Sequence, residues 1–584
     1  MKYFKFATLS ILAGIIFSGL QHSALAQSYQ KLQKVSEALK SDIRPWRGGS
    51  SSLKVPMIAW GGDIQTILAN GMSKKTTSTS HFAKAGLNIE LFREDQFLKQ
   101  LAAYLKAETP FLRGTLGMIN SAAEVTNSDP NAEMVIIYQL TWSAGSDVIV
   151  VKDTIQKPAD LKGKTIAIQS FGPHIDYLTT VLSSANLTPQ DITWKWVPDL
   201  FEVDARSFSP AMALTNDSSV DGAMVIMPDA QILTSGGNIG NGAEGSVKGG
   251  KILMSTKTAD RVIADVYAVR KDFLKKYPDT VNRFVKALID AEAEARNLSK
   301  TKSNRWKELM RKSAALLLDD QNAFNDMEQM YYEADFAGIA GNYQFFVDSN
   351  YPRRAAKLNE EIQSAFVSLK LLSSKQSIGL SPIDFESLSS GGTMEIEVKQ
   401  HFNPDAVNKL IARRQSSNGL DKGELFSFEI FFAPNQKIFP PNLYSKEFDK
   451  AIELISTYGG ALMTLEGHSD PMGYLKKKKD NEPKIILERY KKSAQNLSVS
   501  RANSVRESLV SYAGGKGVLI DVSQFAVIGH GVMKPNTPTV NYDRDGDLAL
   551  ESAPRTKEQW DATRRVVFRI LQVEAEEEAF TPLF

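Results

Sequence analysis

Residues 465–473 read LEGHSDPMG, so His468, Ser469 and Asp470 stand in a row at the end of an apolar stretch. These residue types could form a catalytic triad, hold a metal ion or bind a charged ligand. A triad needs a histidine that faces the serine, but neighbouring residues on a strand point to opposite faces. A metal site is disfavoured because the six histidines are scattered and the chain has no cysteine. We therefore expect ligand binding here, with no catalytic residue, no metal and no cofactor.

The first residues of the chain predict export. Lys2 and Lys5 precede an apolar stretch of 14 residues at 7–20, and small residues follow at 24–26. This layout is typical of a secretory signal peptide, residues 1–26, that is cleaved after its last alanine. The apolar stretch is shorter than the roughly 20 residues that span a membrane, which disfavours the alternative of an uncleaved anchor. We therefore expect a periplasmic protein whose mature chain has no transmembrane span.

Length and charge narrow the class of protein further. A chain of 584 residues with 42% hydrophobic and 23% charged residues predicts two to four globular domains. Removal of the signal peptide leaves 67 basic and 67 acidic residues, so nothing indicates a nucleic-acid partner. The absence of cysteine excludes disulfide bonds and a lipid anchor on an N-terminal cysteine.

Short apolar strands alternate with amphipathic helices from about 50 to 300, which predicts an α/β fold with mostly parallel sheets. Strands are expected at 54–62, 88–95, 147–153, 164–170, 221–227 and 262–270, and helices at 64–72, 96–108, 174–186 and 278–297. Residues 303–372 have helical spacing and complete a first domain at 27–372. Residues 373–422 are rich in Ser, Gly and Asn, which predicts a linker with some local structure.

A second module is predicted at 423–575. Its expected order is strand, helix, strand, helix, strand and strand, at 424–432, 445–459, 461–470, 498–514, 525–531 and 564–573.

In the first domain, glycines and small residues follow several expected strands. The clearest turns are AWGGD at 59–63 and QSFGPH at 169–174, and two further candidates are INSAAE at 119–124 and LTWSAGSD at 140–147. Ligands of α/β proteins bind where strands run into helices. Glycine lets the backbone approach a ligand closely, and free N–H groups at a helix start favour an anion.

These features resemble the periplasmic solute-binding proteins of the nitrate, sulfonate, taurine and thiamine-precursor type. The resemblance rests on DLKGKTIAIQSFG at 160–172, DGAMVIMPDA at 221–230 and the early glycine pair, and it covers about 50–300. It implies two α/β lobes that close on a small molecule at a hinge. By this resemblance the solute-binding residues are Trp60, Gly61, Asp63, Ser121, Ser170, Phe171, Gly172 and Asp229. The alternative is that the glycines only form tight turns.

The second module resembles the OmpA-like peptidoglycan-binding domain. The motifs are LEGHSD at 465–470, LSVSRANSV at 497–505, VIGHG at 527–531 and RRVVFRI at 564–570, in that order. The resemblance implies a small βαβαβ domain with helices on one face of its sheet. It also implies binding of the diaminopimelate residue in the stem peptide of the bacterial wall.

The residue types suit that ligand. The free end of diaminopimelate carries an ammonium and a carboxylate, which a carboxylate and a guanidinium can bind. The resemblance gives these roles to Asp470 and Arg501, with Ser469, Leu497 and Arg565 as supporting residues. The alternative is an ion pair between Asp470 and Arg501 that only joins strand to helix.

The second module departs from the family pattern in two ways. Ala494 and Thr563 stand where the family usually has asparagine, and the stretch between Asp470 and Leu497 is unusually long. Within that stretch, residues 474–492 carry eight basic and three acidic residues. This insertion is either a solvated helical hairpin or a contact for anionic wall polymer or lipid head groups.

Two further motifs match known ligand-binding loops only in part. GNGAEG at 240–245 has the spacing of a dinucleotide-binding loop but lacks the strand before it and the helix after it. NYDRDGD at 541–547 resembles the first half of a calcium loop, but position twelve is Ser552. A solvated turn is the preferred interpretation, with weak calcium binding left open.

The sequence therefore predicts a solute-binding protein, not an enzyme, held to peptidoglycan by its second module. We expect it to capture a small anionic or zwitterionic solute for an ABC-type transporter permease or a sensor. The alternative is a structural envelope protein whose first domain docks a protein partner. A wall hydrolase is the weakest hypothesis because no carboxylate pair or zinc site can be assembled from the sequence.

Overall fold

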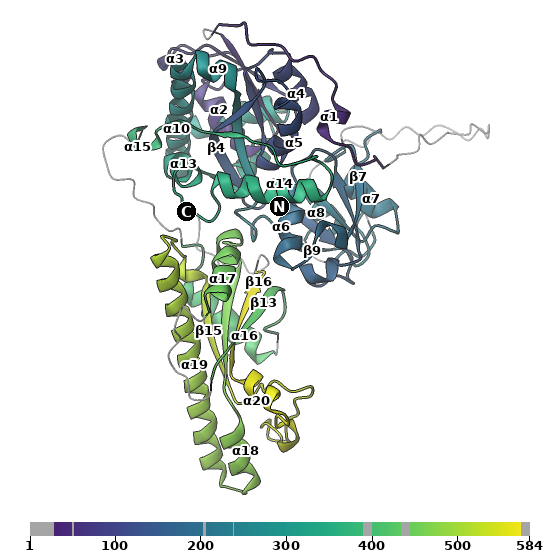
Figure 1. Ribbon diagram of the computed structural model, residues 1–584, viewed down its shortest axis with the longest axis vertical. Helices are drawn as coiled ribbons and strands as arrows, with labels where there is room; N and C mark the ends of the chain where they lie inside the picture. Colours follow the sequence, from purple (N-terminus) through teal and green to yellow (C-terminus); the bar gives the residue numbers. More distant parts are fainter. Residues whose placement is uncertain are drawn as a thin grey trace, which may run out of the picture.

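The computed structural model describes residues 29–49, 52–202, 206–237, 239–243, 245–388, 400–417, 419–433 and 444–573. The predicted signal peptide lies outside these residues. Among the described helices, none is long and apolar enough to cross a membrane. Figure 1 shows two α/β lobes at one end of the molecule and a C-terminal module at the other, with the long helix α19 running from the far end of this module back toward the lobes.

The first lobe contains two sheets. Strand β1 (Leu53–Met57) pairs in parallel with β2 (Ile89–Arg93), and a larger sheet has the order β11-β4-β10-β3, with β12 beside β4. The strands of the larger sheet are β3 (Phe111–Thr115), β4 (Met134–Ser143), β10 (Ala264–Arg270), β11 (Ala334–Phe336) and β12 (Gly379–Leu380). The helices are α1 (Val35–Ala38), α2 (Ile64–Ala69), α3 (His81–Lys84), α4 (Phe97–Leu105), α5 (Leu116–Thr126), α9 (Lys271–Lys276), α10 (Pro278–Thr301), α11 (Asn304–Leu317), α12 (Phe324–Tyr332), α13 (Gly338–Phe346), α14 (Ala355–Ser368) and α15 (Phe385–Leu388).

Helix α10 shows how the sequence forms these elements. It begins with Pro278 at its first position and Asp279 in its first turn, both favourable at a helix start. Its apolar residues recur at three- and four-residue spacing, and Val281, Phe284 and Leu288 are fully buried. The predicted helix at 278–297 is therefore present.

The second lobe is a five-stranded sheet with the order β7-β6-β8-β5-β9. Its strands are β5 (Asp147–Val151), β6 (Thr165–Gln169), β7 (Thr193–Val197), β8 (Gly222–Ile226) and β9 (Lys251–Ser255), and its helices are α6 (Ile175–Ser184), α7 (Pro210–Asn216) and α8 (Met227–Leu233). The glycine-rich loop at 240–245 follows a helix and precedes a strand, which is the reverse of the order that dinucleotide binding requires.

The prediction of mostly parallel sheets is wrong, because both lobes have mixed sheets. Strand β10 is antiparallel to β3 and β4, and β5 is antiparallel to β8 and β9. The chain passes from the first lobe to the second between β4 and β5 and returns between β9 and β10. Strands β5 and β10, the first strands after the two crossings, therefore run antiparallel to their neighbours. The alternation of strands and helices in the sequence does not reveal the direction of these strands.

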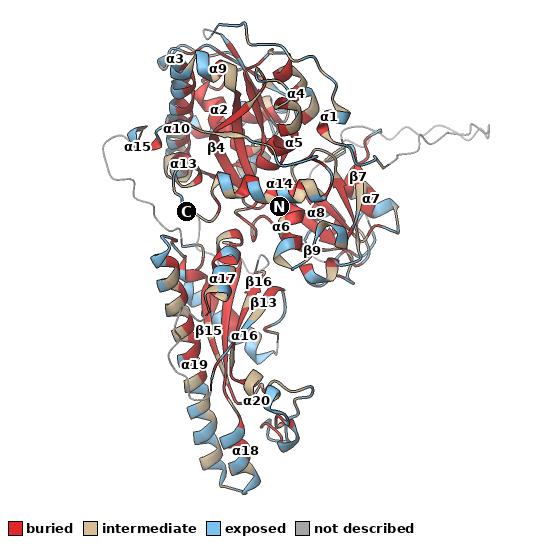
Figure 2. Cartoon of the chain, viewed as in Figure 1, coloured by how far each residue is buried: buried red, intermediate tan, exposed pale blue. Residues whose placement is uncertain are grey.

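The C-terminal module has a four-stranded sheet with the order β13-β16-β14-β15, of which only β14 and β15 are parallel. Its strands are β13 (Glu424–Phe431), β14 (Leu462–His468), β15 (Phe525–Gly531) and β16 (Arg565–Leu571). Its helices are α16 (Pro404–Ser416), α17 (Ser445–Thr457), α18 (Met472–Lys479), α19 (Lys484–Gly515) and α20 (Lys557–Thr563). Figure 2 shows buried residues along the strands, whereas α18 and the first half of α19 are largely exposed.

Two glycines let α19 lie directly on the sheet. A Cβ atom at Gly467 would collide with the carbonyl oxygen of Ser498, and one at Gly529 would meet Val499 and Ser498 Oγ. These glycines are the first residues of the two Gly-His pairs in the sequence, and β14 and β15 pair them in register. The motifs therefore encode close packing of a helix backbone on two strands.

Helix α16 lies within the range 373–422 that the sequence predicts as a linker. Phe402, Val407, Leu410 and Ile411 are buried against the sheet face opposite α19, in contact with residues such as Leu462. Spacing of three and four residues is present here, but the surrounding Ser, Gly and Asn obscure it. The sheet therefore carries helices on both faces, whereas helices on one face were expected.

The C-terminal module contacts the second lobe at the crossing segment between β9 and β10. Gly459 N donates to Asp260 Oδ1 at 2.9 Å, and Tyr458 Oη donates to Ser184 Oγ at 2.9 Å. A Cβ atom at Gly460 would collide with the carbonyl oxygen of Lys257. The module thus packs against one of the two segments that connect the lobes.

Candidate functional site

Buried polar side chains meet where the chain crosses between the lobes. Asp147, the first residue of β5, accepts from Ser143 Oγ at 2.5 Å and lies 2.6 Å from His174 Nε2. Thr256, on the returning segment, is 2.8 Å from Ser143 Oγ and accepts from the backbone N–H of Gly145. Both crossing segments and the start of α6 therefore share one hydrogen-bonded cluster.

Asp176 extends this cluster toward the first lobe. It lies in the first turn of α6, is 1% exposed, and its carboxyl is so close to Gly117 in α5 that a Cβ atom there would collide with it. Burial raises the pKa of Asp176 to about 7, and the charge of Asp147 adds to this, although the backbone N–H groups of Asp176 and Tyr177 oppose it. Neither carboxyl oxygen has a hydrogen-bond partner among the described residues. The first turns of α5 and α6 therefore face each other across a buried carboxyl group.

Glu333 closes the other side of the same junction. Its Oε2 accepts from Ser146 Oγ at 2.7 Å, and its carbonyl accepts from the backbone N–H of Ala144. Burial raises the pKa of Glu333, and the nearby charge of Asp147 adds to the shift. The junction, defined here by Ser146, Asp147, His174, Asp176 and Glu333, is therefore rich in carboxyl groups.

Two of the predicted solute-binding residues belong to a different, fully buried network. Asp63 has no exposed surface and pairs with Arg113, which also pairs with Asp265. Burial raises the pKa of Asp63 to about 6, against the opposing effect of Arg113. Trp60 Nε1 donates to Thr141 Oγ1, which in turn donates to Asp265. Asp63 is thus enclosed in the first lobe, and Trp60 lies at the edge of its network.

The remaining predicted residues do not converge on one site. Gly61 is buried against the carbonyl of Met330, and Ser121 is buried inside α5, where it donates to Met118 O. Gly172 is buried beside Gln169.

Ser170 and Phe171 line a cavity of about 10 Å³ with Leu32, Trp196 and other residues. Such a volume has room for at most about one water molecule. Phe171 has a φ of 58°, which places this non-glycine residue in the left-handed region. These two residues therefore face the N-terminal segment and not the junction.

Asp229 lies in the first turn of α8, close to the crossing segment, because Met227 N donates to Ser146 O at 2.7 Å. Its Oδ2 is buried without a partner among the described residues, and burial raises its pKa to about 6, helped by the charge of Glu202.

Sequence reasoning missed Asp147, His174, Asp176 and Glu333. Two of them stand at the ends of the quoted turns 140–147 and 169–174, so strand ends followed by a polar residue were the available signal.

In the C-terminal module, the predicted wall-binding residues do come near each other. Arg564 Nη1 lies 3.1 Å from Asp470 Oδ2, and the Asp470 side chain is 27% exposed. Arg501 is 3% exposed, with its guanidinium over the ring of Phe432 at 5.4 Å. Burial lowers the pKa of Arg501, the positive charge of Arg564 lowers it further, and Asp470 opposes both. The two guanidinium groups therefore lie near Asp470, and Arg564, which also pairs with Asp561, is a member that the sequence analysis missed.

The supporting residues have different roles. Ser469 is buried and donates to Ala494 O at 3.0 Å, which ties the end of β14 to α19. Leu497 is half-buried on α19. Arg565 pairs with Glu429 at 2.9 Å and lies on the sheet face, so the neighbouring Arg564 is the arginine beside Asp470.

The basic insertion and the aspartate-rich loop contact each other. Lys478 pairs with Asp543 at 2.7 Å, Lys484 with Asp545 at 3.3 Å, and Lys491 with Asp547 at 2.5 Å. Three carboxylates that a calcium ion would need are therefore paired with lysines from the hairpin of α18 and α19. The same pairs neutralise part of the positive charge that suggested an anionic partner.

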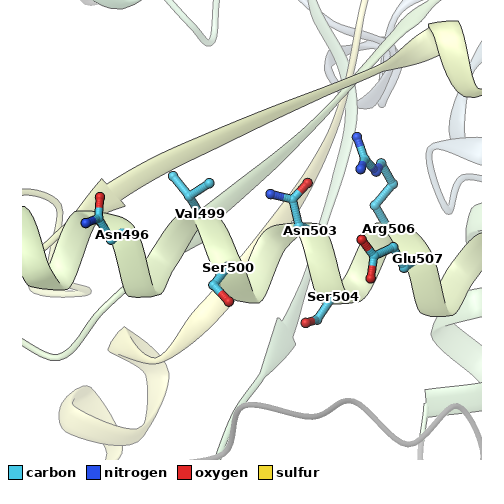
Figure 3. Close-up of a pocket in the computed structure, with 7 residues that line it drawn as sticks. All are labelled: Asn496, Val499, Ser500, Asn503, Ser504, Arg506 and Glu507. Atoms are coloured by element: carbon cyan, nitrogen blue, oxygen red, sulfur yellow. The ribbon is translucent and has the colours of Figure 1, made fainter.

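A groove of about 680 Å³ runs along the exposed side of α19, and Figure 3 shows that its lining residues all belong to this helix. They are Asn496, Val499, Ser500, Asn503, Ser504, Arg506 and Glu507. A groove bounded by one helix does not enclose a small ligand, since ligand pockets bury most of the ligand surface. None of the predicted site residues lies in it.

A protein-family match covers part of the first domain. Residues 78–297 match the family described as NMT1/THI5 like. The chain is also 29% identical over 182 residues to the taurine-binding periplasmic protein of Escherichia coli strain K12. This match covers 31% of the chain and spans about half of that relative, 49% of its length. The N-terminal part is thus similar to binding proteins for small solutes.

Two solved structures show a limited similarity to the chain. The periplasmic aliphatic sulphonate binding protein SsuA from Escherichia coli is 15% identical, with 61% of this chain and 99% of that chain covered and a TM-score of 0.39. The desulfurization enzyme DSZB is 16% identical, with 58% and 96% covered and a TM-score of 0.34.

Proposed function

We propose that the two lobes bind a small solute at their junction. The observation that carries this proposal is the meeting of two helix starts, those of α5 and α6, at the buried carboxyl of Asp176. Free N–H groups at helix starts favour an anionic group. The Asp176 carboxyl lies against Gly117, and we expect the solute to enter when the two lobes separate. The family match over 78–297 and the taurine-binding relative support this proposal.

The junction also indicates the charge of the solute. Asp147, Asp176 and Glu333 supply carboxyl groups, and these favour a cationic group in the ligand. The two helix starts favour an anionic group nearby. A zwitterion satisfies both requirements, whereas nitrate or a simple alkanesulfonate satisfies only the second. We therefore expect a zwitterionic aminosulfonate or amino acid to bind better than an anion of the same size.

Thermal melting of the full chain tests this proposal. The panel contains taurine, an alkanesulfonate of equal length without the amine, nitrate, a phosphonate and a pyrimidine. A zwitterion should raise the melting temperature by several degrees at 100-fold excess over its Kd. The rise should be smaller for Asp176→Asn and unchanged for Asp290→Asn, which alters an exposed pair on α10. If no compound raises the melting temperature and no small molecule co-purifies, solute capture is unsupported, and docking of a protein partner becomes the better hypothesis.

We also propose that the C-terminal module anchors the protein to peptidoglycan in the periplasm. The βαβαβ order from β13 to β15 and the cluster of Asp470, Arg501 and Arg564 support an OmpA-like domain. In the absence of ligand, Asp470 and Arg564 compensate each other's charge. A zwitterion such as the free end of diaminopimelate can replace both partners, with its ammonium at the aspartate and its carboxylate at the arginines. With the first proposal, this describes a wall-anchored binding protein that presents its solute to an ABC-type transporter.

Pull-down with purified sacculi tests the anchor. Asp470→Ala and Arg501→Ala should each weaken binding at least 30-fold, since loss of one partner of a desolvated charge contact costs about 2–5 kcal/mol. Asp449→Ala, which removes an exposed carboxylate of α17 that pairs with Lys516, is the matched control. Circular dichroism verifies that each variant is folded. Equal retention of all three variants on sacculi would contradict the assigned pocket.

A further inference from the structure

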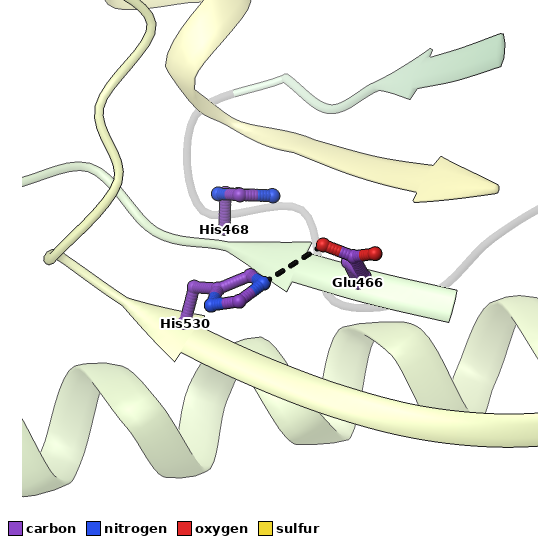
Figure 4. Close-up of side chains that lie close together, drawn as sticks. All are labelled: Glu466, His468 and His530. Atoms are coloured by element: carbon purple, nitrogen blue, oxygen red, sulfur yellow. Dashed lines mark hydrogen bonds and ion pairs between the residues drawn. The ribbon is translucent and has the colours of Figure 1, made fainter. Parts of the chain in front are cut away.

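Two histidines that are 62 positions apart in the sequence lie side by side on the C-terminal sheet. Strands β14 and β15 are parallel and pair Gly467 with Gly529, so the residue after each glycine points to the opposite face from α19. The ring centroids of His468 and His530 are 4.8 Å apart. Glu466, two residues before His468, shares their face, and His530 Nε2 lies 2.9 Å from its Oε2. Figure 4 shows the three side chains directed toward one another from the two strands.

The hydrogen bonds of His468 leave one ring nitrogen with a free lone pair. His468 Nδ1 lies 3.1 Å from Lys534 O, and because a carbonyl only accepts, Nδ1 carries the proton. His468 is 3% exposed, and its Nε2 is buried with no hydrogen-bond partner among the described residues. A histidine that donates one N–H to a backbone carbonyl and directs the other nitrogen into a cluster has the usual orientation of a metal ligand.

We propose that Glu466, His468 and His530 form a binding site for a divalent transition-metal ion such as Zn²⁺. One ligand atom from each residue lies within 4.8 Å of the other two. Tetrahedral zinc with bonds of about 2.0–2.1 Å needs neighbouring ligand atoms about 3.3 Å apart, so the widest separation must shorten by up to about 1.5 Å. Two imidazoles and one carboxylate suit zinc, copper or nickel and do not suit calcium or magnesium. Water completes the coordination.

The surrounding charges set the expected strength of binding. Glu466 Oε1 accepts from Arg569 Nε at 2.9 Å and from Thr464 Oγ1 at 3.0 Å, which fixes the carboxylate and leaves Oε2 toward the histidines. Arg569 also pairs with Glu424, and Arg565 pairs with Glu429. The positive charges of Arg565 and Lys534 also lie near His468. The same cations disfavour an added positive charge, and we expect micromolar affinity.

Calorimetric titration of Zn²⁺ into EDTA-treated full chain, prepared without a polyhistidine tag, tests the site. We expect one equivalent with micromolar affinity, a loss of at least tenfold for His468→Gln and His530→Gln, and no change for His81→Gln. His81 is the matched control because it also pairs with a glutamate, Glu294. Absence of saturable binding, or equal affinity in all four proteins, would overturn the proposal.

A second measurement uses the unaltered protein, so its outcome does not depend on whether the variants fold. Hydrogen–deuterium exchange at the imidazole C2 position, followed by peptide mass spectrometry, compares the chain with and without Zn²⁺. Zinc should protect His468 and His530 and leave the reactivity of His81 unchanged. Protection of neither histidine, or equal protection of His81, would overturn the proposal. Calcium and magnesium should give no protection, which separates metal coordination from a general effect of ionic strength.

Discussion

Arg113 in the first lobe and Arg564 in the C-terminal module both join carboxylates, but in different surroundings. Arg113 and Asp63 have no exposed surface, and Asp265 is almost fully enclosed. Asp470, beside Arg564, has 27% of its side chain exposed. A fully buried cluster must remain paired because an uncompensated charge there is costly. A pair at the edge can exchange its partners for those of a charged ligand, so exposure distinguishes the structural cluster from the candidate binding site.

The largest expected effect comes from breaking the buried cluster. Arg113→Ala leaves Asp63 and Asp265 buried without their cation, and it should lower the free energy of unfolding by about 3–5 kcal/mol. Urea unfolding of the full chain measures this loss. Arg93→Ala, which removes a half-exposed partner of Asp95 and Asp319, should cost no more than about 1 kcal/mol. Equal losses of unfolding free energy in the two variants would show that burial does not determine how much an ion pair contributes to stability.

The second-largest effect is the pH dependence of stability that arises from protonation of Asp176 at the junction. The pKa of Asp176 is about 7 in the folded protein, against about 3.9 in an unfolded chain. The folded state therefore binds the proton more tightly, and stability falls as pH rises between these two values. From pH 5 to pH 8 the expected loss is about 2–3 kcal/mol. Asp176→Asn should remove this part of the pH dependence of the melting temperature. Identical pH profiles for wild type and variant would contradict the assigned burial of the carboxyl.

The third effect distinguishes the adjacent residues Arg564 and Arg565 by their contributions to binding of sacculi. Arg564→Ala should weaken binding to sacculi by tenfold or more, because it removes the guanidinium beside Asp470. Arg565→Ala should change binding less than about twofold, since this side chain pairs with Glu429. The sequence analysis selected Arg565, so the reverse result would favour the sequence over the structure.

The smallest effect concerns the aspartate-rich loop. Since Lys478, Lys484 and Lys491 pair with its carboxylates, millimolar calcium should leave the melting temperature of the full chain within about 2 °C of its value in EDTA. A calcium-dependent rise of several degrees would show that the ion displaces the lysines.

The sequence predicted those features that local patterns encode. The alternation of strands and helices, the start of α10 and the strands of the C-terminal module follow from spacing and from cap residues. Asp470 and Arg501 were selected by the resemblance of their motifs to a known family, and they lie near each other in the structure.

The missed features depend on contacts that are distant in the sequence. The antiparallel crossing strands, the packing of α16 on the C-terminal sheet and the approach of Asp176 to Gly117 have no local signature. The pairing of His468 with His530 requires knowledge that β14 and β15 are parallel neighbours in register. The two Gly-His pairs were visible in the sequence, but their register was not.

Calorimetric titration of a diaminopimelate-containing stem peptide into the full chain tests most directly whether the edge pair is an exchangeable binding site. The account predicts saturable binding with one peptide per chain, lost in Asp470→Asn and retained in Arg93→Ala. Absence of binding to the unaltered protein, or undiminished binding to Asp470→Asn, would contradict it.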